Sequence, residues 1–329
     1  MDPMKRREAT IALVALGVLS FAAKAQPQGK SYRIGFLGLS SPSDYAPNLN
    51  AFLQGLRELG YEDGRNIAIE YRWAGGRDER LPELAAQLAR LNPNVIVTHA
   101  TGVRAAQEAT STIPIVMGVS ADPVGLGLIK SLAKPGGNTT GVASQMVDLS
   151  SKRLELLKEI APKLKVVAVL SRAAVPGALK GLAETEVAAR KLGLRVRSFE
   201  IVGEPSALES VFAAIVLERP DALIVQPDPL IGRYHDRIAT FALRNKLPAM
   251  GGVQSFVVDG GLISYGGNFY EGWRLAARYV DRILKGARPG DLPVEQPTTF
   301  ELAINLKTAK ALGLTIPPSL VLRASEVIQ

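Results

Sequence analysis

The sequence predicts an α/β protein made of two doubly wound, Rossmann-like lobes that are joined by three hinge crossings. From Ser31 onward, short runs of apolar and β-branched residues alternate with amphipathic helical segments. Continuous apolar runs are typical of strands covered on both faces, and this alternation is typical of parallel sheets flanked by helices. The helical pattern stops at a glycine-rich stretch, residues 136–141, and strand–helix alternation starts afresh at Lys165. This break favours two lobes over the alternative, one sheet of eight or more parallel strands.

Nine segments are expected to be strands because they carry such apolar runs with little alternation. They are Tyr32–Leu39, Ile67–Arg72, Val95–His99, Ile113–Val119, Val166–Ser171, Arg195–Ile201, Ala222–Gln226, Leu262–Tyr265 and Phe300–Asn305.

The helices are predicted from apolar residues at helical spacing. In the first one, Leu49, Phe52, Leu56 and Leu59 form one face, and Gly60 follows where a C-terminal cap belongs. The same periodicity predicts helices over Leu81–Leu91, Leu154–Ile160, Ala178–Leu192, Ala207–Leu217, Tyr234–Asn245, Gly272–Leu284 and Leu306–Gly313.

The order of these elements suggests how the chain divides. The first lobe is expected to comprise residues 31–143 and 267–293, and the second residues 144–266 and 298–329. The crossings fall near residues 141–147, 260–267 and 289–297, which are rich in glycine or proline. A few crossing segments can absorb the dihedral change of domain closure while packed lobes stay rigid.

The first 25 residues have the pattern of a secretory signal peptide. Lys5, Arg6 and Arg7 precede an apolar run over Ala9–Ala23, and Ala23-Lys24-Ala25 offers small residues at a cleavage site near Ala25. The run is shorter than a spanning helix needs, and a buried N-terminal helix, the alternative, would be apolar on every face. We therefore expect a protein of the periplasm.

The amino-acid composition excludes several kinds of functional site. The 329 residues include no cysteine, which excludes disulfides, thiolate zinc sites and a cysteine nucleophile. Cleavage after residue 25 would remove four basic and two acidic side chains, so the formal charge of +8 would fall to +6. Since no cluster of five or more lysines and arginines occurs along the sequence, we expect no nucleic-acid partner. We also expect that the protein has no cofactor and is a monomer.

Signatures of catalysis are missing. The sequence holds no Gly-x-Ser-x-Gly, no Gly-x-Gly-x-x-Gly after the first strand and no phosphate-binding loop. Its two histidines lack partners at metal-ligand spacing. His235 lies beside Asp236 and Arg237, and is expected to be a solvated surface residue. His99 ends a strand, and a hydrogen-bonded cleft histidine is favoured there over a general base.

Ligands of doubly wound sheets bind outside the carboxyl ends of the strands. The residues there are rich in hydroxyls and amides and poor in catalytic types, as a hydrogen-bonding cleft requires. The predicted ligand-binding residues are Ser40, Ser41, Tyr45, Thr98, His99, Thr101, Ser120, Asp122, Gln226, Asp228, Gln254 and Tyr265.

Three of these residues have two interpretations. Thr101 and Gly102 begin a helix whose free N–H groups could receive a ligand carboxylate, or Thr101 caps its own helix. Asp122 and Asp228 could bind a ligand amine or, each being followed by a proline, start a turn. The aromatic residues near these loops are candidates to stack on a ligand, although most are expected to serve packing: Tyr45, Trp73, Phe256, Tyr265, Phe269 and Tyr270.

Four stretches together resemble a known family. They are Ile113–Val116, Ser120–Val124, Lys134–Gly141 and Asn305–Ser319. In this order they are similar to the solute-binding proteins of ABC uptake systems of the tryptophan/tyrosine type, over nearly the whole chain from Tyr32 to Ile328. The resemblance implies a type I periplasmic-binding fold, a small solute closed between the lobes, and delivery to a membrane permease. Some members bind aromatic amino acids.

The sequence therefore predicts an extracytoplasmic solute-binding protein, not an enzyme. It would capture an amino acid or an aromatic or carboxylate compound by hinge closure and pass it to an ABC permease. Two alternatives stay open: a secreted α/β hydrolase or isomerase that uses His99 and Asp122, and a subunit that senses the ligand for a membrane receptor.

Overall fold

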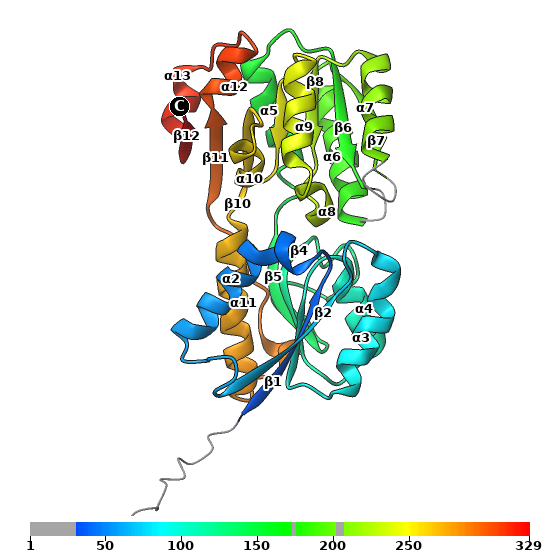
Figure 1. Cartoon of the computed structure of the whole chain (residues 1–329), viewed down its shortest axis with the longest axis vertical. Coiled ribbons are helices and arrows are strands. Elements are labelled where there is room, and N and C mark those ends of the chain that lie inside the picture. Colours follow the sequence, from blue (N-terminus) through cyan, green and yellow to red (C-terminus); the bar gives the residue numbers. More distant parts are fainter. Residues whose placement is uncertain (1–30, 173–175, 202–206) are drawn as a thin grey trace, which may run out of the picture. The chain divides into compact units, whose positions relative to one another are not determined.

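The computed structural model describes residues 31–172, 176–201 and 207–329, and the predicted signal peptide lies outside them. These residues form two sheets, each covered by helices on both faces (Figure 1). In the described part of the chain, no helix combines the length and the apolar character needed to cross a bilayer.

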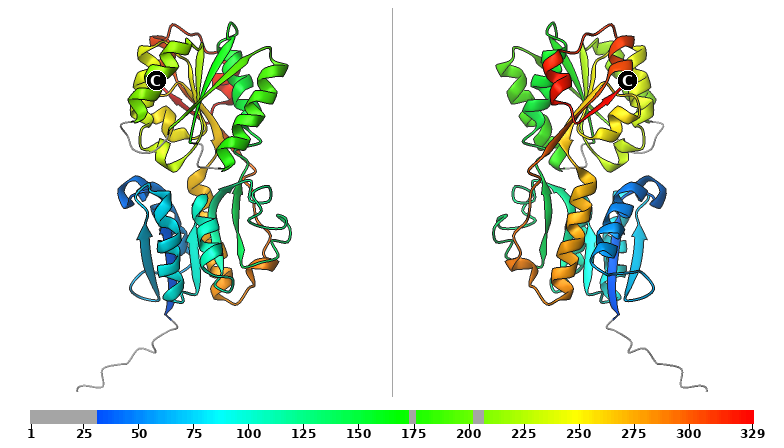
Figure 2. Two further views of the ribbon diagram at one scale, coloured as in Figure 1. Left: turned by 90° about the vertical axis from the view of Figure 1, so that its right-hand side faces the viewer. Right: turned by 90° about the vertical axis from the view of Figure 1, so that its left-hand side faces the viewer.

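The first sheet has five parallel strands in the order β2-β1-β3-β4-β5. The strands are β1 (Tyr32–Gly38), β2 (Ile67–Trp73), β3 (Val95–Thr98), β4 (Ile115–Ala121) and β5 (Thr139–Ser144). One face is covered by α2 (Pro42–Glu58) and α11 (Phe269–Leu284), and the other by α3 (Leu81–Arg90) and α4 (Thr101–Ala109), as Figures 1 and 2 show. The short 3₁₀ helices are η1 (Asp78–Arg80) and η2 (Pro289–Asp291).

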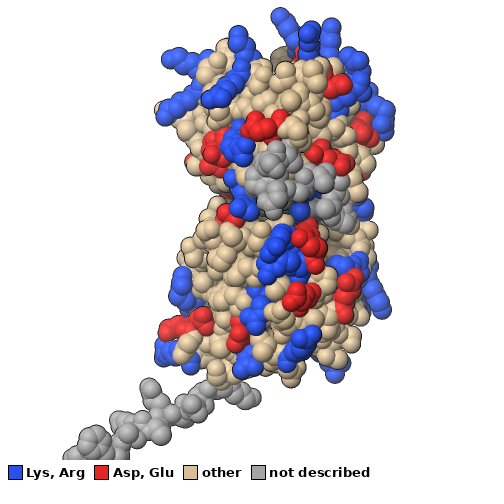
Figure 3. Space-filling view, turned by 45° about the vertical axis from the view of Figure 1, so that its right-hand side comes forward, with Lys and Arg blue, Asp and Glu red and all other residues tan. Residues whose placement is uncertain are grey.

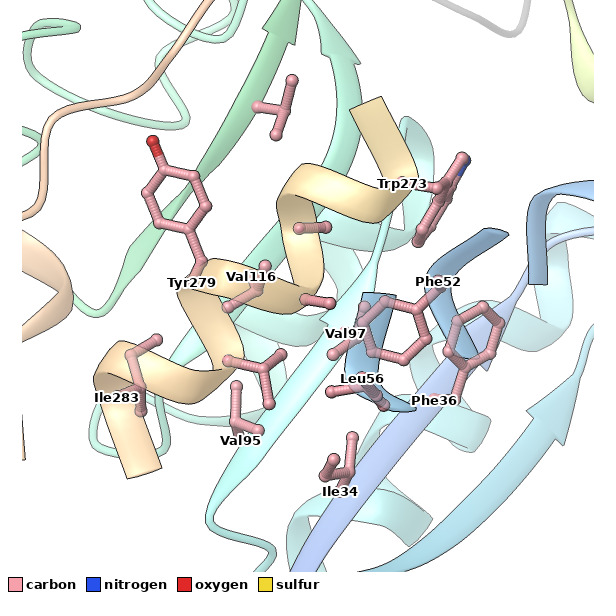
Figure 4. Packing of buried hydrophobic residues seen from close by; sticks show 14 of the residues in the cluster. Ile34, Phe36, Phe52, Leu56, Val95, Val97, Val116, Trp273, Tyr279 and Ile283 are labelled. Carbon is pink, nitrogen blue, oxygen red and sulfur yellow. The ribbon is translucent and has the colours of Figure 1, made fainter. Parts of the chain in front are cut away.

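Successive residues of a central strand enter the cores on opposite faces, as the pleat requires. Phe36 of β1 packs with Phe52 of α2 and Trp273 of α11 (Figure 4). The next residue, Leu37, joins the core beneath α3 and α4 with Leu88. This placement on both faces explains why the strand has a continuous apolar run. Each of these side chains, fully buried, contributes roughly 1.5–3 kcal/mol relative to exposure.

The second sheet has seven strands in the order β12-β11-β10-β9-β8-β6-β7. The strands are β6 (Val166–Ser171), β7 (Arg195–Glu200), β8 (Ala222–Val225), β9 (Ala249–Gly251), β10 (Ile263–Gly267), β11 (Phe300–Asn305) and β12 (Glu326–Ile328). Only the pairing of β10 with β11 is antiparallel. The helices are α5 (Ser150–Ile160), α6 (Pro176–Lys191), α7 (Ala207–Glu218), α8 (Pro229–Gly232), α9 (His235–Arg244), α10 (Gln254–Val258), α12 (Leu306–Ala311) and α13 (Pro318–Arg323).

All nine predicted strands are present, each within two residues of its predicted ends, but β5, β9 and β12 were not predicted. Strand β5 begins at Thr139, inside the glycine-rich break, so the first sheet continues into residues 141–147, where the sequence predicted the first crossing. Gly141 has a φ of +134°, and a Cβ there would lie 2.2 Å from the carbonyl oxygen of Met117 on β4. The glycine therefore permits close approach of two strand backbones rather than ending the sheet.

Three segments carry the chain between the sheets. They run from β5 to α5, from β10 to α11, and from η2 to β11. Arg153 of α5 ties the first two segments together: its Nε donates to the carbonyl of Tyr265 at 2.8 Å and its Nη1 to that of Met146 at 2.9 Å. Burial lowers the pKa of this arginine to about 10. The exact lobe boundaries given by the sequence stay a prediction.

Candidate ligand-binding site

A cavity of about 360 Å³ lies at the carboxyl ends of strands from both sheets. Tyr45 of α2, His99 at the end of β3 and Trp273 of α11 line it from the first sheet's side, and Asp228 and Gln254 line it from the second's. The volume is within the range of small-molecule sites, and the position is where open α/β sheets bind ligands.

An aromatic wall forms one side of the cavity. The rings of Tyr45 and His99 stack with centroids 4.8 Å apart and an interplanar angle of 28°. The indole of Trp273 meets both rings edge-on, with centroids 5.5 Å away. Such a wall offers apolar area together with two polar edges, which suits a ligand with an aromatic or flat apolar part.

The backbone makes room for this wall. A Cβ on Gly118 of β4 would lie 2.2 Å from carbons of the Trp273 indole, so only glycine lets the ring lie over the strand. Asn268 starts α11 by accepting a hydrogen bond from the backbone N–H of Glu271 at 3.0 Å, which fixes the first turn of the helix, directly before Trp273.

The imidazole of His99 is held neutral. Burial lowers its pKa to about 3, because the charged form would be desolvated. Its Nδ1 is 3.0 Å from the hydroxyl of Tyr45, whose own pKa burial raises well above 10. In the described part of the chain its Nε2 has no hydrogen-bond partner. If Tyr45 donates to Nδ1, the ring proton is on Nε2, ready to donate to an acceptor on a ligand.

Further polar atoms at the same strand ends are buried and unpartnered. Among the described residues, these are the hydroxyls of Ser40, Thr101 and Ser120 and both amide atoms of Gln226. Since buried polar groups are nearly always hydrogen-bonded, each such atom requires an explanation. Five residues at or just beyond the carboxyl ends of β1, β3, β4 and β8 share this state, so a polar ligand is the simplest common partner.

The structure places the twelve predicted residues in three groups. Tyr45, His99, Asp228 and Gln254 line the cavity. The unpartnered Ser40, Thr101, Ser120 and Gln226 are buried at the strand ends, and the last three adjoin lining residues in the sequence. The other four are engaged elsewhere: Ser41 caps α2, Thr98 donates to the carbonyl of Leu37, Asp122 pairs with Lys180, and Tyr265 packs on Phe300.

The structure contradicts one of the two interpretations of Thr101. Ala100 is the N-cap of α4 and no side chain caps the helix, so the capping interpretation is wrong. Ala100 and Asp122 both have positive φ, +45° and +42°, directly after β3 and β4. Such strained residues cluster at functional sites.

The turn interpretation holds for both aspartates, whatever their role toward a ligand. Asp122 accepts from the N–H of Gly125 at 2.9 Å, and Asp228 accepts from that of Ile231 at 3.2 Å. Asp228 also pairs with Nε of Arg172 at 3.2 Å.

Three ion pairs link segments of the first sheet to segments of the second. Asp44 lies 3.0 Å from Nε of Arg233, Asp78 lies 3.0 Å from Nη1 of Arg172, and Asp122 meets Lys180. In every pair the first sheet's side supplies the carboxylate and the second's supplies the cation.

The expectation for His235 was wrong. This residue is 4% exposed, lines the cavity and packs edge-on against Phe256 with ring centroids 5.3 Å apart. The sequence pattern showed only that Asp236 and Arg237 are polar, whereas the start of α9 turns His235 inward beneath α10. Its Nδ1 lies 3.6 Å from Asp259.

Of the aromatic residues that were candidates to stack on a ligand, some line the cavity and others serve packing. Tyr45, Phe269 and Tyr270 line the cavity, whereas Phe256 is a fully buried packing residue and Trp73 stacks on Tyr71.

Sequence reasoning missed several lining residues because it considered mainly strand ends and the loops beside them. Trp273, Asp44 and Arg233 lie in or beside helices at the cavity. One usable signal existed for Trp273: it falls in the first turn of a helix that directly follows a predicted crossing.

A second cavity of about 500 Å³ is lined by residues of all three crossing segments, such as Ser144, Gly267 and Pro297. Its charged residues include Arg274 and Glu58, which are already bound to each other. No group of three or more potential metal ligands occurs within residues 31–172, 176–201 and 207–329. The first cavity, with its unpartnered polar surroundings, is therefore the better candidate.

Comparison with known proteins gives consistent results. Residues 39–328 match the sequence profile of a family described as ABC transporter substrate binding protein. A tyrosine-binding protein of Clostridioides difficile is 30% identical over 268 residues, which cover 80% of this chain and 75% of that protein.

Two solved structures align over 91% of this chain and all of theirs. One is a conserved domain protein from Vibrio cholerae, with a TM-score of 0.84 and 30% identity. The other is a domain from Streptococcus pneumoniae in complex with L-tryptophan, with a TM-score of 0.83 and 27% identity. A ligand-free, open substrate-binding protein from Clostridium difficile aligns over 91% of this chain and 99% of its own, with a TM-score of 0.65 and 27% identity.

More distant neighbours share the fold alone. A solute-binding protein from Agrobacterium vitis with bound allitol has a TM-score of 0.59 at 15% identity, over 85% of this chain and 98% of its own. Together with the two sheets described above, these similarities confirm the predicted fold class, two α/β lobes of the type I periplasmic-binding fold.

Proposed function

This chain belongs to the family of ABC transporter substrate-binding proteins, and we propose that it captures an aromatic amino acid between its lobes for delivery to a membrane permease. The observation that carries the proposal is the coincidence of two features at one set of strand ends. One is the aromatic wall of Tyr45, His99 and Trp273, and the other is the set of buried, unpartnered polar atoms beside it.

The ligand's carboxylate is assigned to the start of α4. Within the described residues the hydroxyl of Thr101 has no hydrogen-bond partner there, and neither has that of Ser120 at the end of β4. The nine-residue helix α4 adds the positive end of its dipole, although the N–H groups of Gly102 and Val103 in its first turn already donate to the carbonyls of His99 and Ala100 at 3.0 and 3.2 Å. Together these uncharged groups can bind a carboxylate without burying an arginine.

The ligand's ammonium is assigned to the acidic part of the lining. Among the described residues, Asp44, Asp228, Asp259 and Glu301 line the cavity together with one lysine or arginine, Arg233. The side chain of the ligand then faces the aromatic wall. The names of two relatives support this class of ligand, since one is a tyrosine-binding protein and the other was solved with L-tryptophan.

Closure of the lobes is part of the proposal. The L-tryptophan complex resembles this chain with a TM-score of 0.83, and the ligand-free open protein only with 0.65, although both are 27% identical to it. The three ion pairs that link the two sheets support the same conformation. A ligand shifts the open–closed equilibrium only by the free energy that it gains from contacting both lobes.

The family and the signal-peptide pattern of residues 1–25 support delivery to a permease and residence in the periplasm as parts of the proposal. The enzyme alternative is disfavoured by the site itself. With a pKa of about 3, His99 is a weak general base at neutral pH, and Asp122 is already engaged by Lys180 and by a turn. A sensing role would use the same closure, and only uptake measurements separate the two.

Calorimetric titration of the purified protein with L-tryptophan and L-tyrosine tests the proposal. Burial of a small ligand with several satisfied hydrogen bonds should give micromolar or tighter affinity, about −8 kcal/mol. If aromatic amino acids do not bind while another solute does, the ligand assignment is wrong. If no small solute binds, the binding function itself is wrong.

A further inference from the structure

Basic side chains gather at the end of the second sheet that lies away from the cavity. Strands β6 to β10 are parallel, so their amino ends share one edge. Lys163 and Lys165 precede β6, and Arg190 and Lys191 end α6 just before Arg195 opens β7. All five are exposed.

Three further segments bring five more cations to the same edge. Arg219 precedes β8, and Arg244 and Lys246 precede β9. Because β11 runs antiparallel to β10, its carboxyl end reaches this edge too and brings Lys307 and Lys310 of α12. We call these ten exposed side chains the basic edge. In the described part of the chain none of them has an ion-pair partner.

The charge of the basic edge is nearly unopposed. Within its five segments, residues 161–165, 190–195, 219–221, 244–248 and 306–313, Asp221 is the one acidic residue. Two carboxylates in the last turns of the adjoining helices, Glu159 and Glu218, pair with Arg323 and Arg197, which are not part of the basic edge. Ten cations and one carboxylate give a formal charge of +9, more than the +8 of the whole chain. Figure 3 shows mostly blue side chains at this end, where α12 lies in Figure 1, while red and blue interleave over the part that holds the first sheet.

Helix chemistry alone does not produce such an edge. Lysine and arginine are favoured in the last turns of helices. In both sheets, these last turns lie at the edge where the parallel strands begin. The first sheet's amino edge, however, carries Glu62, Asp63, Glu108 and Asp291 among its cations, and Arg65 there pairs with Glu62 at 3.1 Å. The segregation of charge is therefore specific to the second sheet.

An apolar side chain lies beside the cations. Leu217, in the last turn of α7 and two residues before Arg219, is 82% exposed. The five segments contain no aromatic residue that could stack on bases, which disfavours single-stranded nucleic acid. Exposed leucine among lysines and arginines is typical of surfaces that bind the headgroup region of anionic bilayers.

We propose that the basic edge is a docking surface for an anionic phospholipid bilayer. Each cation near such a surface is attracted to its negative potential, and the attraction is screened by salt. Docking would keep the protein close to the membrane, where a permease would receive its ligand. The surface lies at the edge of the sheet opposite to the ligand cavity, so the proposal does not depend on which solute is bound.

Sedimentation of the purified protein with vesicles tests the proposal. Vesicles with about one-third phosphatidylglycerol in phosphatidylcholine should bind it at low salt, and pure phosphatidylcholine should not. Raising the ionic strength to about 0.5 M should weaken binding at least tenfold. Absence of binding at low salt, or equal binding to both vesicle types, would overturn the proposal.

Two triple variants locate the surface. Lys163→Glu/Lys165→Glu/Arg219→Glu should lose vesicle binding, whereas Arg90→Glu/Lys134→Glu/Arg288→Glu, an equal change of charge on the first sheet's side, should bind within about twofold of the wild type. All six residues are exposed and circular dichroism checks their folding. If either protein unfolds, Arg244→Glu/Lys246→Glu/Lys310→Glu makes the same test. Equal losses of vesicle binding in the variants of the basic edge and of the first sheet's side would refute the assignment of the docking surface to the basic edge.

A final variant separates a bilayer from a soluble polyanion. Leu217→Gln should weaken vesicle binding severalfold and leave binding to inorganic polyphosphate unchanged, because only a bilayer offers an apolar layer to the leucine. Tighter binding to polyphosphate than to vesicles at equal phosphate concentration, with no effect of Leu217→Gln, would contradict the membrane assignment.

Discussion

The hydroxyl of Tyr45 lies 3.0 Å from Nδ1 of His99, and the two rings stack in the same contact. The hydrogen bond satisfies one nitrogen of the buried imidazole, and the stacking shields the ring from water. His99 is thereby kept neutral while its other nitrogen, Nε2, stays unpartnered in the described part of the chain.

Stability should depend on pH through His99. An unfolded histidine binds a proton below about pH 6.5, but folded His99 does so only below about 3. Between these values the unfolded state holds more protons, so the free energy of unfolding falls as the pH is lowered, by about 2 kcal/mol at pH 5. Denaturant unfolding at pH 7 and pH 5 measures this difference in the free energy of unfolding. His99→Gln should lose this part of the dependence, and an unchanged slope would contradict the assignment.

Two threonines near the start of α4, Thr98 and Thr101, should respond in opposite ways. Thr101→Val should weaken binding of an aromatic amino acid by about 1–3 kcal/mol without lowering the stability of the free protein, because its hydroxyl has no partner there. Thr98→Val, the matched control, should cost about 1 kcal/mol of stability, because its hydroxyl donates to the carbonyl of Leu37 at 2.9 Å. Equal effects of the two changes on affinity would remove Thr101 from the site.

The aromatic wall should depend on Gly118. In Gly118→Ala the new Cβ would overlap the indole of Trp273, and we expect a loss of about 1–3 kcal/mol in stability together with weaker ligand binding. Gly137→Ala is the control, since nothing lies within 4 Å of a Cβ there and φ is not positive. Thermal unfolding and calorimetry measure both changes. If Gly118→Ala binds as the wild type does, Trp273 does not shape the site.

Closure should depend on the pair between Asp78 and Arg172. Asp78→Asn removes a bond between the two sheets' segments, while Arg172 keeps Asp228 as its partner. We expect affinity to fall by about 1–3 kcal/mol and small-angle scattering to show an expanded population that ligand compacts. Asp291→Asn, an exposed carboxylate without an ion pair in the described residues, should change neither. Unchanged scattering and affinity in Asp78→Asn would argue against this contact as a determinant of closure.

Much of the fold was predictable because strands covered on both faces leave a strong local signal. The run Val166–Ser171 gave β6 with its exact ends. Strand β5 could not be recognised because Gly141 interrupts its apolar pattern, and the reason for that glycine is the backbone of Met117, 24 residues earlier.

The site was predictable only where topology determines it. Residues after parallel strands must meet at one edge, so the position of His99 at the cavity could be predicted. Trp273 was missed because its contacts with the cavity depend on how α11 packs across β4, and its place near the start of a helix after a crossing was the one signal for it. The basic edge was missed for the same reason: its cations come from five separate segments and never form a run along the sequence.

The central claim is that the unpartnered polar atoms at the strand ends receive an aromatic amino acid. Calorimetric titration of the wild type and of Thr101→Val with L-tryptophan and L-tyrosine tests it most directly. We expect saturable binding of one ligand per chain at micromolar or tighter affinity, weakened about fivefold to 150-fold by the substitution. Absence of binding of either amino acid at millimolar concentration would contradict it.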